Sequence, residues 1–375
     1  MSSSIEQVLH QGIEKRLHTG GQIAVRHLGQ EVLTMAFGTN GDGEPMTLDH
    51  ALPLLSAGKP LTAAAVMKLW ERNEISIDDV VVKYLPEFGQ MGKEAITLRD
   101  CLLHTAGLRH VAVKWWDRPV VEILQSICEA EIEPNWEPGK TAGYHIGSTW
   151  FVLGEVIRRV MGADLRRALR ELVLDPASMT HTTIGMGDDG YESLVSAGRL
   201  GRMYDTLAIS AAAHHGHAAE PSPGKPQLWE LPQSFIDARC PANARGTARD
   251  LAHFYQLLMD GDDRLVNPVT ACAMTARHRI ATMDLTFKAK VDTGLGVICN
   301  SAHYGQPVLP YGFGPAASIR AFGHGGNMSS IGMADPQHDL VVVVLFNGQP
   351  GEPRHQTRIA ETLTCIYRDV VGVSP

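Results

Sequence analysis

The sequence predicts an α/β fold in which a sheet flanked by helices is built from both ends of the chain, with an all-helical domain inserted between them. Three observations lead to this prediction. A helix and a strand hairpin stand at the start of the chain, helical segments fill its middle, and buried strands followed by a helix form its end. Elements in that order indicate one α/β domain and one helical domain.

The start of the chain contains the helix and the hairpin. Apolar residues recur at helical spacing between residues 5 and 17, which predicts an amphipathic helix. Two strand-like runs follow, residues 22–28 and 31–37, and the pair Gly29–Gln30 joins them. Two such runs around a short glycine-containing turn are typical of a β-hairpin.

The middle of the chain is mainly helical. Residues 61–73 are rich in Ala, Leu and Met, and residues 97–104 form a short helix that a threonine caps. Residues 150–160 and 164–174 show helical periodicity. Residues 211–231 are rich in His, Pro and Gly and predict a long surface loop.

Strand character returns toward the end of the chain. Residues 294–300 and 331–334 predict short buried strands. Residues 340–347, with the sequence LVVVVLFN, form a continuous β-branched run that is typical of a central strand. Residues 354–370 then predict a closing amphipathic helix.

These elements divide the 375 residues into two domains. A chain of this length exceeds one ordinary core, since a domain averages about 150 residues. We expect residues 1–55 and 236–375 to form the α/β domain and residues 56–235 to form the mainly helical one. An active site is expected in the cleft between them.

Composition excludes several classes of partner. The net charge of -8 and the pI near 6.1 argue against nucleic acid or an anionic membrane, because both require a basic surface. No segment approaches the roughly 20 apolar residues of a membrane helix, and the first residues lack the pattern of a signal peptide. The six cysteines are scattered, without a C-x-x-C pair, which favours reduced thiols and a cytoplasmic location.

The chain contains two Ser-x-x-Lys motifs, a pattern short enough to arise by chance. Ser222 and Lys225 lie in EPSPGKPQ, where three prolines and a glycine prevent a helix from holding the two side chains on one face. Ser56 follows a turn and opens a predicted helix, so Lys59 lies one turn away on the same face. The helix N-terminus also supplies N–H groups where an oxyanion would form.

A nucleophilic serine needs further residues. Its hydroxyl is a poor nucleophile until a base takes its proton, and a lysine serves only if its pKa is lowered or a tyrosine shares the task. Tyr144 follows a Pro-Gly turn and precedes a predicted helix, and His324-Gly325-Gly326 leads into a predicted strand. Both are candidates for the rest of such a site.

Most of the chain resembles a known family. Its ordered motifs are similar to those of the β-lactamase-like serine hydrolases related to class C β-lactamases, which include esterases, DD-peptidases and transacylases. NEISIDDVVVKYLPEF, ITLRDCLLHTAGL, RGTARDLAHFYQLL and HGG followed by IGMADPQHDL carry the resemblance over most of the chain. It implies a β-lactamase-like α/β fold, with an antiparallel sheet flanked by helices and an inserted helical domain.

The resemblance also implies roles for the first three site residues. Ser56 would be the acylated nucleophile and Lys59 its proton acceptor. Tyr144 would be the partner base, which later protonates the leaving group. His104, in LLHTAGL, is expected to have a structural hydrogen-bonding role.

The motif that begins at His324 would complete the site. His324 stands where the family has the lysine of its K-T-G motif, and Gly325 and Gly326 would keep the strand open to substrate. The backbone N–H groups of Ser56 and Asn327 would form the oxyanion hole.

Two departures from the family pattern bear on the substrate. The family's Y-x-N motif ends here in Ile146, which cannot hydrogen-bond an amide through its side chain. His324 removes a permanent cation that would attract a carboxylate. Together they favour a small ester or thioester as substrate.

Two alternatives remain open: a DD-peptidase or weak β-lactamase, and a catalytically inactive binding or scaffold relative.

Other features have simpler interpretations. His214-His215-Gly216-His217 lies in a loop without acidic or cysteine neighbours, so we expect no metal site there, and no cofactor is implied. The two tryptophans Trp115 and Trp116, together with Trp150, could line an acyl pocket or belong to the core. No G-x-S-x-G motif is present, which argues against an α/β-hydrolase. The oligomeric state is left open.

Overall fold

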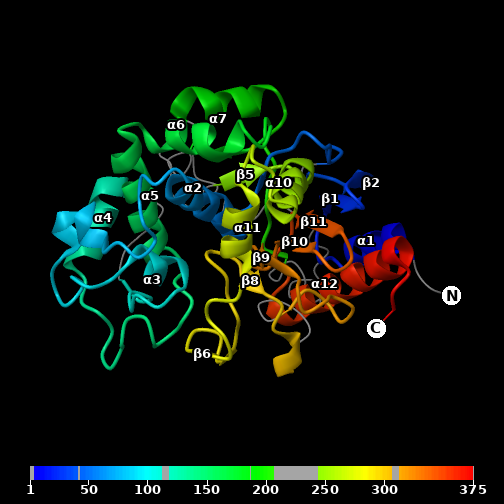
Figure 1. Ribbon diagram of the computed structural model, residues 1–375. Coiled ribbons are helices and arrows are strands. Elements are labelled where there is room, and N and C mark those ends of the chain that lie inside the picture. Colours follow the sequence, from blue (N-terminus) through cyan, green and yellow to red (C-terminus); the bar gives the residue numbers. More distant parts are fainter. Residues whose placement is uncertain are drawn as a thin grey trace, which may run out of the picture.

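A six-stranded antiparallel sheet forms the centre of the α/β part of the molecule (Figure 1). The computed structural model describes residues 4–40, 43–111, 118–185, 187–206, 244–305 and 312–374. In spatial order the strands of the sheet are β2 (Gln30–Gly38), β1 (Gly20–His27), β11 (Leu340–Phe346), β10 (Ser330–Asp335), β9 (Phe322–Gly325) and β8 (Ile298–Cys299). The N-terminal hairpin therefore joins the C-terminal strands in one sheet.

The alternating side chains of the strands supply two separate cores. On β1 and β11, Val25 and Val342 face a cluster with α1 (Ile5–Glu14) and α12 (Glu352–Ile366), and these two helices pack against each other. The intervening Val341 and Val343 belong to a second cluster on the other face, which α10 (Ala248–Asp260) covers. Since successive side chains of a strand point to opposite faces, β11 is buried on both, as its β-branched run predicts.

The second core continues from the sheet into the helical part of the molecule. The helices of that part are α2 (Lys59–Glu71), α3 (Leu98–Leu102), α4 (Val120–Glu129), α5 (Ser148–Met161), α6 (Leu165–Leu169), α7 (Gly187–Ser196) and α11 (Pro268–Thr275). Ten of the thirteen residues of α2 are buried, so this helix is covered on nearly every side. It contacts α5, α11 and β9, and thereby links the helices to the sheet.

The structure also contains two small sheets. The first has the order β3 (Leu52–Pro53), β5 (Ala244–Gly246), β4 (Thr183–Ile184), and the second is the hairpin of β6 (Met283–Asp284) and β7 (Ala289–Lys290). β3 leads into the turn that carries Ser56, and β6 ends beside Ala142, close to Tyr144.

The predicted fold class is confirmed, and so are the hairpin, the capped helix after Thr97 and the strand at residues 340–347. The strand predicted over residues 294–300 is largely wrong, because only Ile298 and Cys299 pair. Gly296 has φ = +81°, and a Cβ there would lie 2.3 Å from the Cβ of Ala63 on α2. The segment therefore turns against α2 before it can join the sheet.

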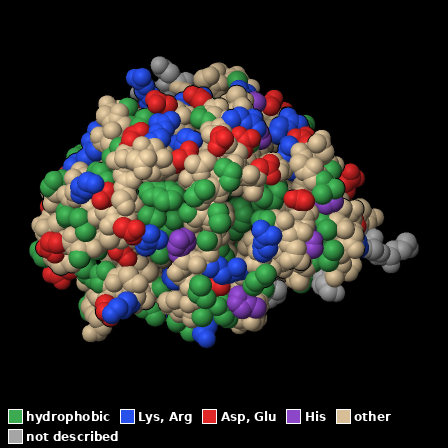
Figure 2. Space-filling model, in the orientation of Figure 1, with side chains coloured by type: hydrophobic (Ala, Val, Ile, Leu, Met, Phe, Trp, Pro, Cys, Tyr) green, Lys and Arg blue, Asp and Glu red, His purple; other side chains and the backbone are tan. Residues whose placement is uncertain are grey.

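The two-domain division stays a prediction, and its boundary near residue 235, like the loop predicted at residues 211–231, lies outside the described residues. Among the helices that the structure describes, none is long and apolar enough to cross a membrane. On the face drawn in Figure 2, acidic and basic side chains are interspersed, and hydrophobic side chains gather near the middle.

Candidate active site

Ser56 lies in a 3-10 turn, Leu55–Gly58, that continues directly into α2. The preceding Leu55 has φ = +49°, a left-handed conformation that is uncommon for a branched residue and is typical of functional turns. The turn contacts the end of β9. A Cβ on Gly326 would lie 2.7 Å from the carbonyl oxygen of Leu54, so a glycine is required for this approach.

Lys59 is the first residue of α2 and is completely buried. Its Nζ lies 3.0 Å from Ser56 Oγ and donates a hydrogen bond of 3.0 Å to the carbonyl oxygen of Ile146. Burial lowers the pKa of Lys59 well below its ordinary value, because the charged ammonium loses its hydration. The environment therefore favours the neutral amine, which has a lone pair available for a proton.

Tyr144 lies beside Lys59, with its ring centroid 4.8 Å from Nζ. Burial raises the pKa of Tyr144 above its usual range, and a hydrogen bond with the Ser56 hydroxyl opposes part of that rise. This shift favours the protonated phenol. The role of Tyr144 as the partner base that later protonates the leaving group stays a prediction.

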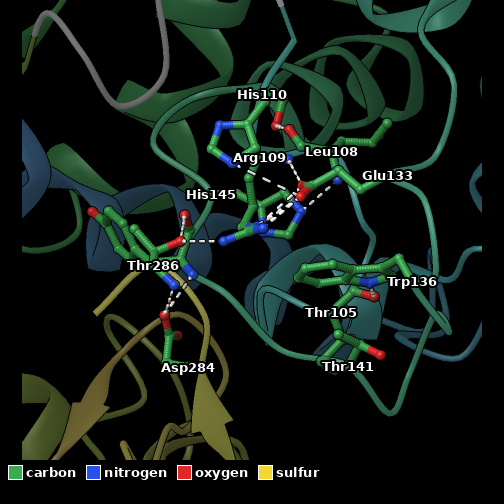
Figure 3. Close-up of polar contacts among 12 residues, drawn as sticks. Thr105, Leu108, Arg109, His110, Glu133, Trp136, Thr141, His145, Asp284 and Thr286 are labelled. Atoms are coloured by element: carbon green, nitrogen blue, oxygen red, sulfur yellow. Dashed lines mark hydrogen bonds and ion pairs between the residues drawn. The ribbon is translucent and has the colours of Figure 1, made fainter. Parts of the chain in front are cut away.

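The β6–β7 hairpin holds the backbone around Tyr144 through Asp284 and Thr286, both of which are shown in Figure 3. The N–H of Tyr144 donates to Asp284 Oδ1 at 3.1 Å, and its carbonyl accepts from Thr286 Oγ1 at 3.0 Å. Asp284 is fully buried; its Oδ1 also accepts from the N–H groups of Thr286 and Phe287, and its Oδ2 accepts from Arg279 at 2.9 Å. The carboxylate thereby fixes Tyr144 and the hairpin turn together.

A second network holds the residue after Tyr144. The N–H of His145 donates to His104 Nδ1 at 3.0 Å, and His145 Nε2 accepts from the N–H of Leu108 at 2.8 Å. Both rings thus accept hydrogen bonds from the backbone, and burial lowers both pKa values, that of His145 to about 3. Arg109 forms an ion pair with Glu133 and reaches Thr286 Oγ1 at 3.3 Å (Figure 3). The geometry agrees with the structural role expected of His104.

His324 extends from β9 toward the same cluster. Its ring centroid lies 5.9 Å from that of Tyr144, and its Nδ1 lies 2.8 Å from the carbonyl oxygen of Gly325. Burial, together with the proximity of Lys59, lowers the pKa of His324 to about 3. The imidazole is consequently neutral at physiological pH, so this position offers no cation to a carboxylate.

The remaining predicted residues contribute mainly through their backbone. The side chain of Ile146 is 64% exposed, and its carbonyl, not its side chain, contacts Lys59. Asn327 is exposed, and its carbonyl oxygen accepts from Gln349 Nε2 at 2.8 Å. The oxyanion hole formed by the N–H groups of Ser56 and Asn327 stays a prediction.

The structure thus brings Ser56, Lys59, Tyr144 and His324 together, with Gly326 packed beside the serine turn. Trp150 is fully buried and its ring lies 5.5 Å from Lys59 Nζ, so it belongs to the core. Several positions singled out in the sequence lie outside the described residues: Ser222, Lys225, the histidines at 214–217, Trp115 and Trp116. Within the described ranges, no group of three or more His, Cys, Asp or Glu side chains could hold a metal ion.

Sequence reasoning missed Asp284, Arg279, Thr286 and His145. Asp284 lies 140 residues from Tyr144 in the chain. Asp284 and Thr286 lie two positions apart in the sequence, which indicates only a local turn, in which the aspartate side chain accepts hydrogen bonds from the backbone N–H groups that follow it. Nothing in that local pattern shows which distant segment the turn supports.

The buried pair of Asp284 and Arg279 yields a stability prediction. Asp284→Asn keeps the size of the side chain but removes the carboxylate that forms an ion pair with the guanidinium of Arg279, itself 4% exposed. We expect the free energy of unfolding, measured by urea denaturation, to fall by about 3–5 kcal/mol. The control is Asp78→Asn, which removes the exposed partner of Arg99 and should cost less than about 1 kcal/mol. Equal effects of the two substitutions would contradict the role of the buried pair.

Comparisons with known proteins place this arrangement in a family. A family model described as Beta-lactamase matches residues 5–364. The chain is 25% identical over 343 residues to the Esterase/beta-lactamase LipL of Mycobacterium tuberculosis, covering 88% of this chain and 77% of that protein. It is 24% identical over 323 residues to a putative D-alanyl-D-alanine carboxypeptidase of Salmonella agona, covering 78% of this chain and 67% of that protein.

Solved structures agree on the fold. The structure titled EstCE1, a hydrolase with promiscuous acyltransferase activity, has a TM-score of 0.77 at 21% identity, covering 96% of this chain and 97% of that one. At that identity the likeness concerns the fold alone. The family model, by contrast, spans nearly the whole sequence, and the chain belongs to the beta-lactamase family of serine hydrolases.

Proposed function

We propose that this protein is a serine-dependent acyl hydrolase or acyltransferase that acts on a small ester or thioester through an acyl-enzyme on Ser56. One observation carries the proposal: Ser56 Oγ lies 3.0 Å from the Nζ of a lysine that is completely buried. Burial favours the neutral amine, which is the form that can take the proton of a serine hydroxyl.

In the first half-reaction, Lys59 Nζ takes the proton of Ser56 as Oγ attacks the substrate carbonyl carbon. The carbonyl oxygen becomes an oxyanion, which the N–H groups of Ser56 and Asn327 stabilise. Tyr144 gives its phenolic proton to the leaving oxygen or sulfur as the bond to the carbonyl carbon breaks, and it recovers a proton from the Lys59 ammonium. The serine proton has then moved to the leaving group, and both Lys59 and Tyr144 are neutral again.

The second half-reaction reverses these transfers. Water or an alcohol gives its proton to the same pair and attacks the acyl carbon, and Ser56 Oγ is released with a proton. Hydrolysis and acyl transfer differ only in this acceptor.

Charge and hydrogen bonding support a neutral ester as the substrate. The neutral imidazole of His324 offers no cation to the carboxylate of a β-lactam or a cell-wall peptide. The exposed aliphatic side chain of Ile146 offers no hydrogen bond to an amide. The names of the relatives include an esterase and a putative carboxypeptidase, so the DD-peptidase or weak β-lactamase is kept as the second candidate.

The acyl-enzyme leads to a mass-spectrometric test. Incubation with a serine-directed phosphonate should add one adduct mass to the intact protein, and Ser56→Ala should abolish the adduct and lower ester turnover by at least about 10⁴-fold. Ser126→Ala, at a serine on α4 whose hydroxyl bonds only to the helix backbone, serves as the control and should still form the adduct. A Ser56→Ala protein that still acquires the adduct would falsify the assignment of the nucleophile.

The pH dependence follows from the two pKa shifts. Activity requires neutral Lys59, whose pKa is lowered, and protonated Tyr144, whose pKa is raised. We expect kcat/KM for para-nitrophenyl butyrate to rise with pH, to reach its plateau well below the pKa of an ordinary lysine, about 10.4, and to hold it to at least about pH 9.5. Circular dichroism over the same range checks that the protein stays folded. A kcat/KM that still increases through about pH 10 would show that Lys59 is not the base.

Substrate preference separates the two enzymatic candidates. Because the site lacks a cation at His324 and an amide partner at Ile146, kcat/KM for para-nitrophenyl butyrate should exceed that for a chromogenic cephalosporin by at least about 100-fold, the equivalent of two lost polar contacts. A kcat/KM for the cephalosporin that equals or exceeds that for the ester would favour the DD-peptidase or β-lactamase. A protein that neither turns over esters nor forms the phosphonate adduct would be the inactive relative.

A further inference from the structure

Arg358 on α12 is a buried cation whose neighbours are all uncharged. The residue is 2% exposed, and burial lowers its pKa, with no carboxylate nearby to oppose the shift in the part of the chain that the structure describes. A guanidinium has five N–H groups. Those of Arg358 meet five acceptor atoms: the carbonyl oxygens of Leu17 (2.7 Å), Met328 (2.9 Å) and Gly348 (2.7 Å), and Nδ1 of His18 (3.1 Å) and of His355 (3.2 Å).

These acceptors require the guanidinium to keep its proton. The other ring nitrogen of His18, Nε2, contacts the carbonyl oxygen of Leu9 at 3.1 Å, so it carries the hydrogen and leaves Nδ1 to accept from Arg358. A neutral guanidine would turn a lone pair toward one of the acceptors, and an arginine begins from a pKa above about 12. Arg358 is therefore charged, and it has no N–H left for a substrate.

One of the acceptors belongs to the loop that follows β9. Met328 has φ = +48°, in the left-handed region, and its carbonyl accepts from Arg358 Nη2. The carbonyl of Asn327 accepts from Gln349 Nε2 at 2.8 Å, and that of Gly326 accepts from the N–H of Ser329 at 3.4 Å. Three successive carbonyl groups of this loop are thus held by hydrogen bonds.

The planar peptide group connects Arg358 to the N–H of Asn327. In a trans peptide the C=O of one residue and the N–H of the next point in opposite directions. Fixing the carbonyl of Met328 therefore orients the N–H of Ser329, which donates to the carbonyl of Gly326. Fixing that carbonyl orients the N–H of Asn327 out of the loop. Two peptide groups, linked by one hydrogen bond, separate the guanidinium from this N–H.

The same loop packs against the turn that carries Ser56. Ser330 Oγ lies 3.4 Å from the carbonyl oxygen of Leu54, and a Cβ on Gly326 would lie 2.7 Å from that oxygen. A shift of the loop would consequently change the position of the Asn327 N–H relative to the serine.

We propose that Arg358 is a positioning residue for the oxyanion hole: it fixes the loop through the Met328 carbonyl and strengthens the N–H of Asn327 as a donor. The inference rests on the proposed function, in which that N–H stabilises the oxyanion. Hydrogen-bonded groups polarise one another, so a cation at the Met328 oxygen makes each following N–H a stronger donor. The benefit grows as negative charge develops on the substrate oxygen, and it therefore lowers the barrier to reaction.

Two esters that differ in one atom isolate this effect. In the thionoester of para-nitrophenyl butyrate, sulfur replaces the carbonyl oxygen, and sulfur is a weak hydrogen-bond acceptor that gains little from an oxyanion hole. The wild-type protein should therefore favour the oxygen ester in kcat/KM by at least about 100-fold, as expected for one oxyanion-hole donor. This ratio reports on the oxyanion hole. Because both substrates are measured on one preparation, it does not depend on the fraction of folded protein.

Substitutions then connect the ratio to Arg358. In Arg358→Met the oxygen-to-thiono ratio should fall about tenfold, a part of the effect of losing the donor itself. Arg358→Lys keeps the charge, but one ammonium cannot hold the carbonyls in the geometry of the fork, so its ratio should lie between the two. Arg277→Met is the control: Arg277 binds the carbonyls of Asn300 and Ile319, and its loss should keep the wild-type ratio.

The outcomes decide between a positioning role and a structural one. If both substrates lose rate equally in Arg358→Met, the ratio is unchanged and Arg358 supports only the fold, which overturns the proposal. If that variant yields no folded protein, Arg358→Lys decides: a ratio at least about threefold below the wild-type value supports the proposal, and the wild-type ratio overturns it.

The experiment also distinguishes this inference from the proposed function. If Ser56 forms the phosphonate adduct and the wild-type protein favours the oxygen ester, an unchanged ratio in the Arg358 variants removes only this inference. If the wild-type protein shows no such preference, the oxyanion hole and the inference fail while the nucleophile stands. If no ester reacts and no adduct forms, the proposed function fails and the inference with it.

Discussion

The complete burial of Lys59 is the constraint on which the rest of the site depends. A lysine can accept the proton of a neighbouring serine only if its ammonium form is disfavoured, and burial supplies that effect. Burial in turn requires that α2 be covered on nearly every side, by α5, α11 and β9. The placement of this one helix between the sheet and the other helices therefore positions Ser56 and sets the protonation state of Lys59.

Tyr144 is held mainly through its backbone. It precedes α5 and has no strand or helix of its own, yet Asp284 and Thr286 bind its N–H and its carbonyl, and the following residue is fixed by His104. Hydrogen bonds to the backbone leave the phenol free to contact Ser56. A buried aspartate whose oxygens are all engaged gives a loop residue the rigidity that a site usually obtains from regular structure.

The three titratable side chains of the site are all biased toward their neutral forms. Burial lowers the pKa values of Lys59 and His324 and raises that of Tyr144. A site without a fixed charge has little attraction for an anionic substrate.

The sequence by itself determined the features that depend on neighbours along the chain. Ser56 and Lys59 are one turn apart, the β-branched run at residues 340–347 is a central strand, and the ordered motifs indicate the family. Tertiary structure decided what depends on distant segments: that Asp284 supports Tyr144, and that Ile146 contacts Lys59 through its carbonyl. Periodicity and spacing report which residues share a helix turn or a strand face. Pairings between residues far apart in the sequence arise only when the chain packs, because burial and hydrogen-bond geometry then select the partners.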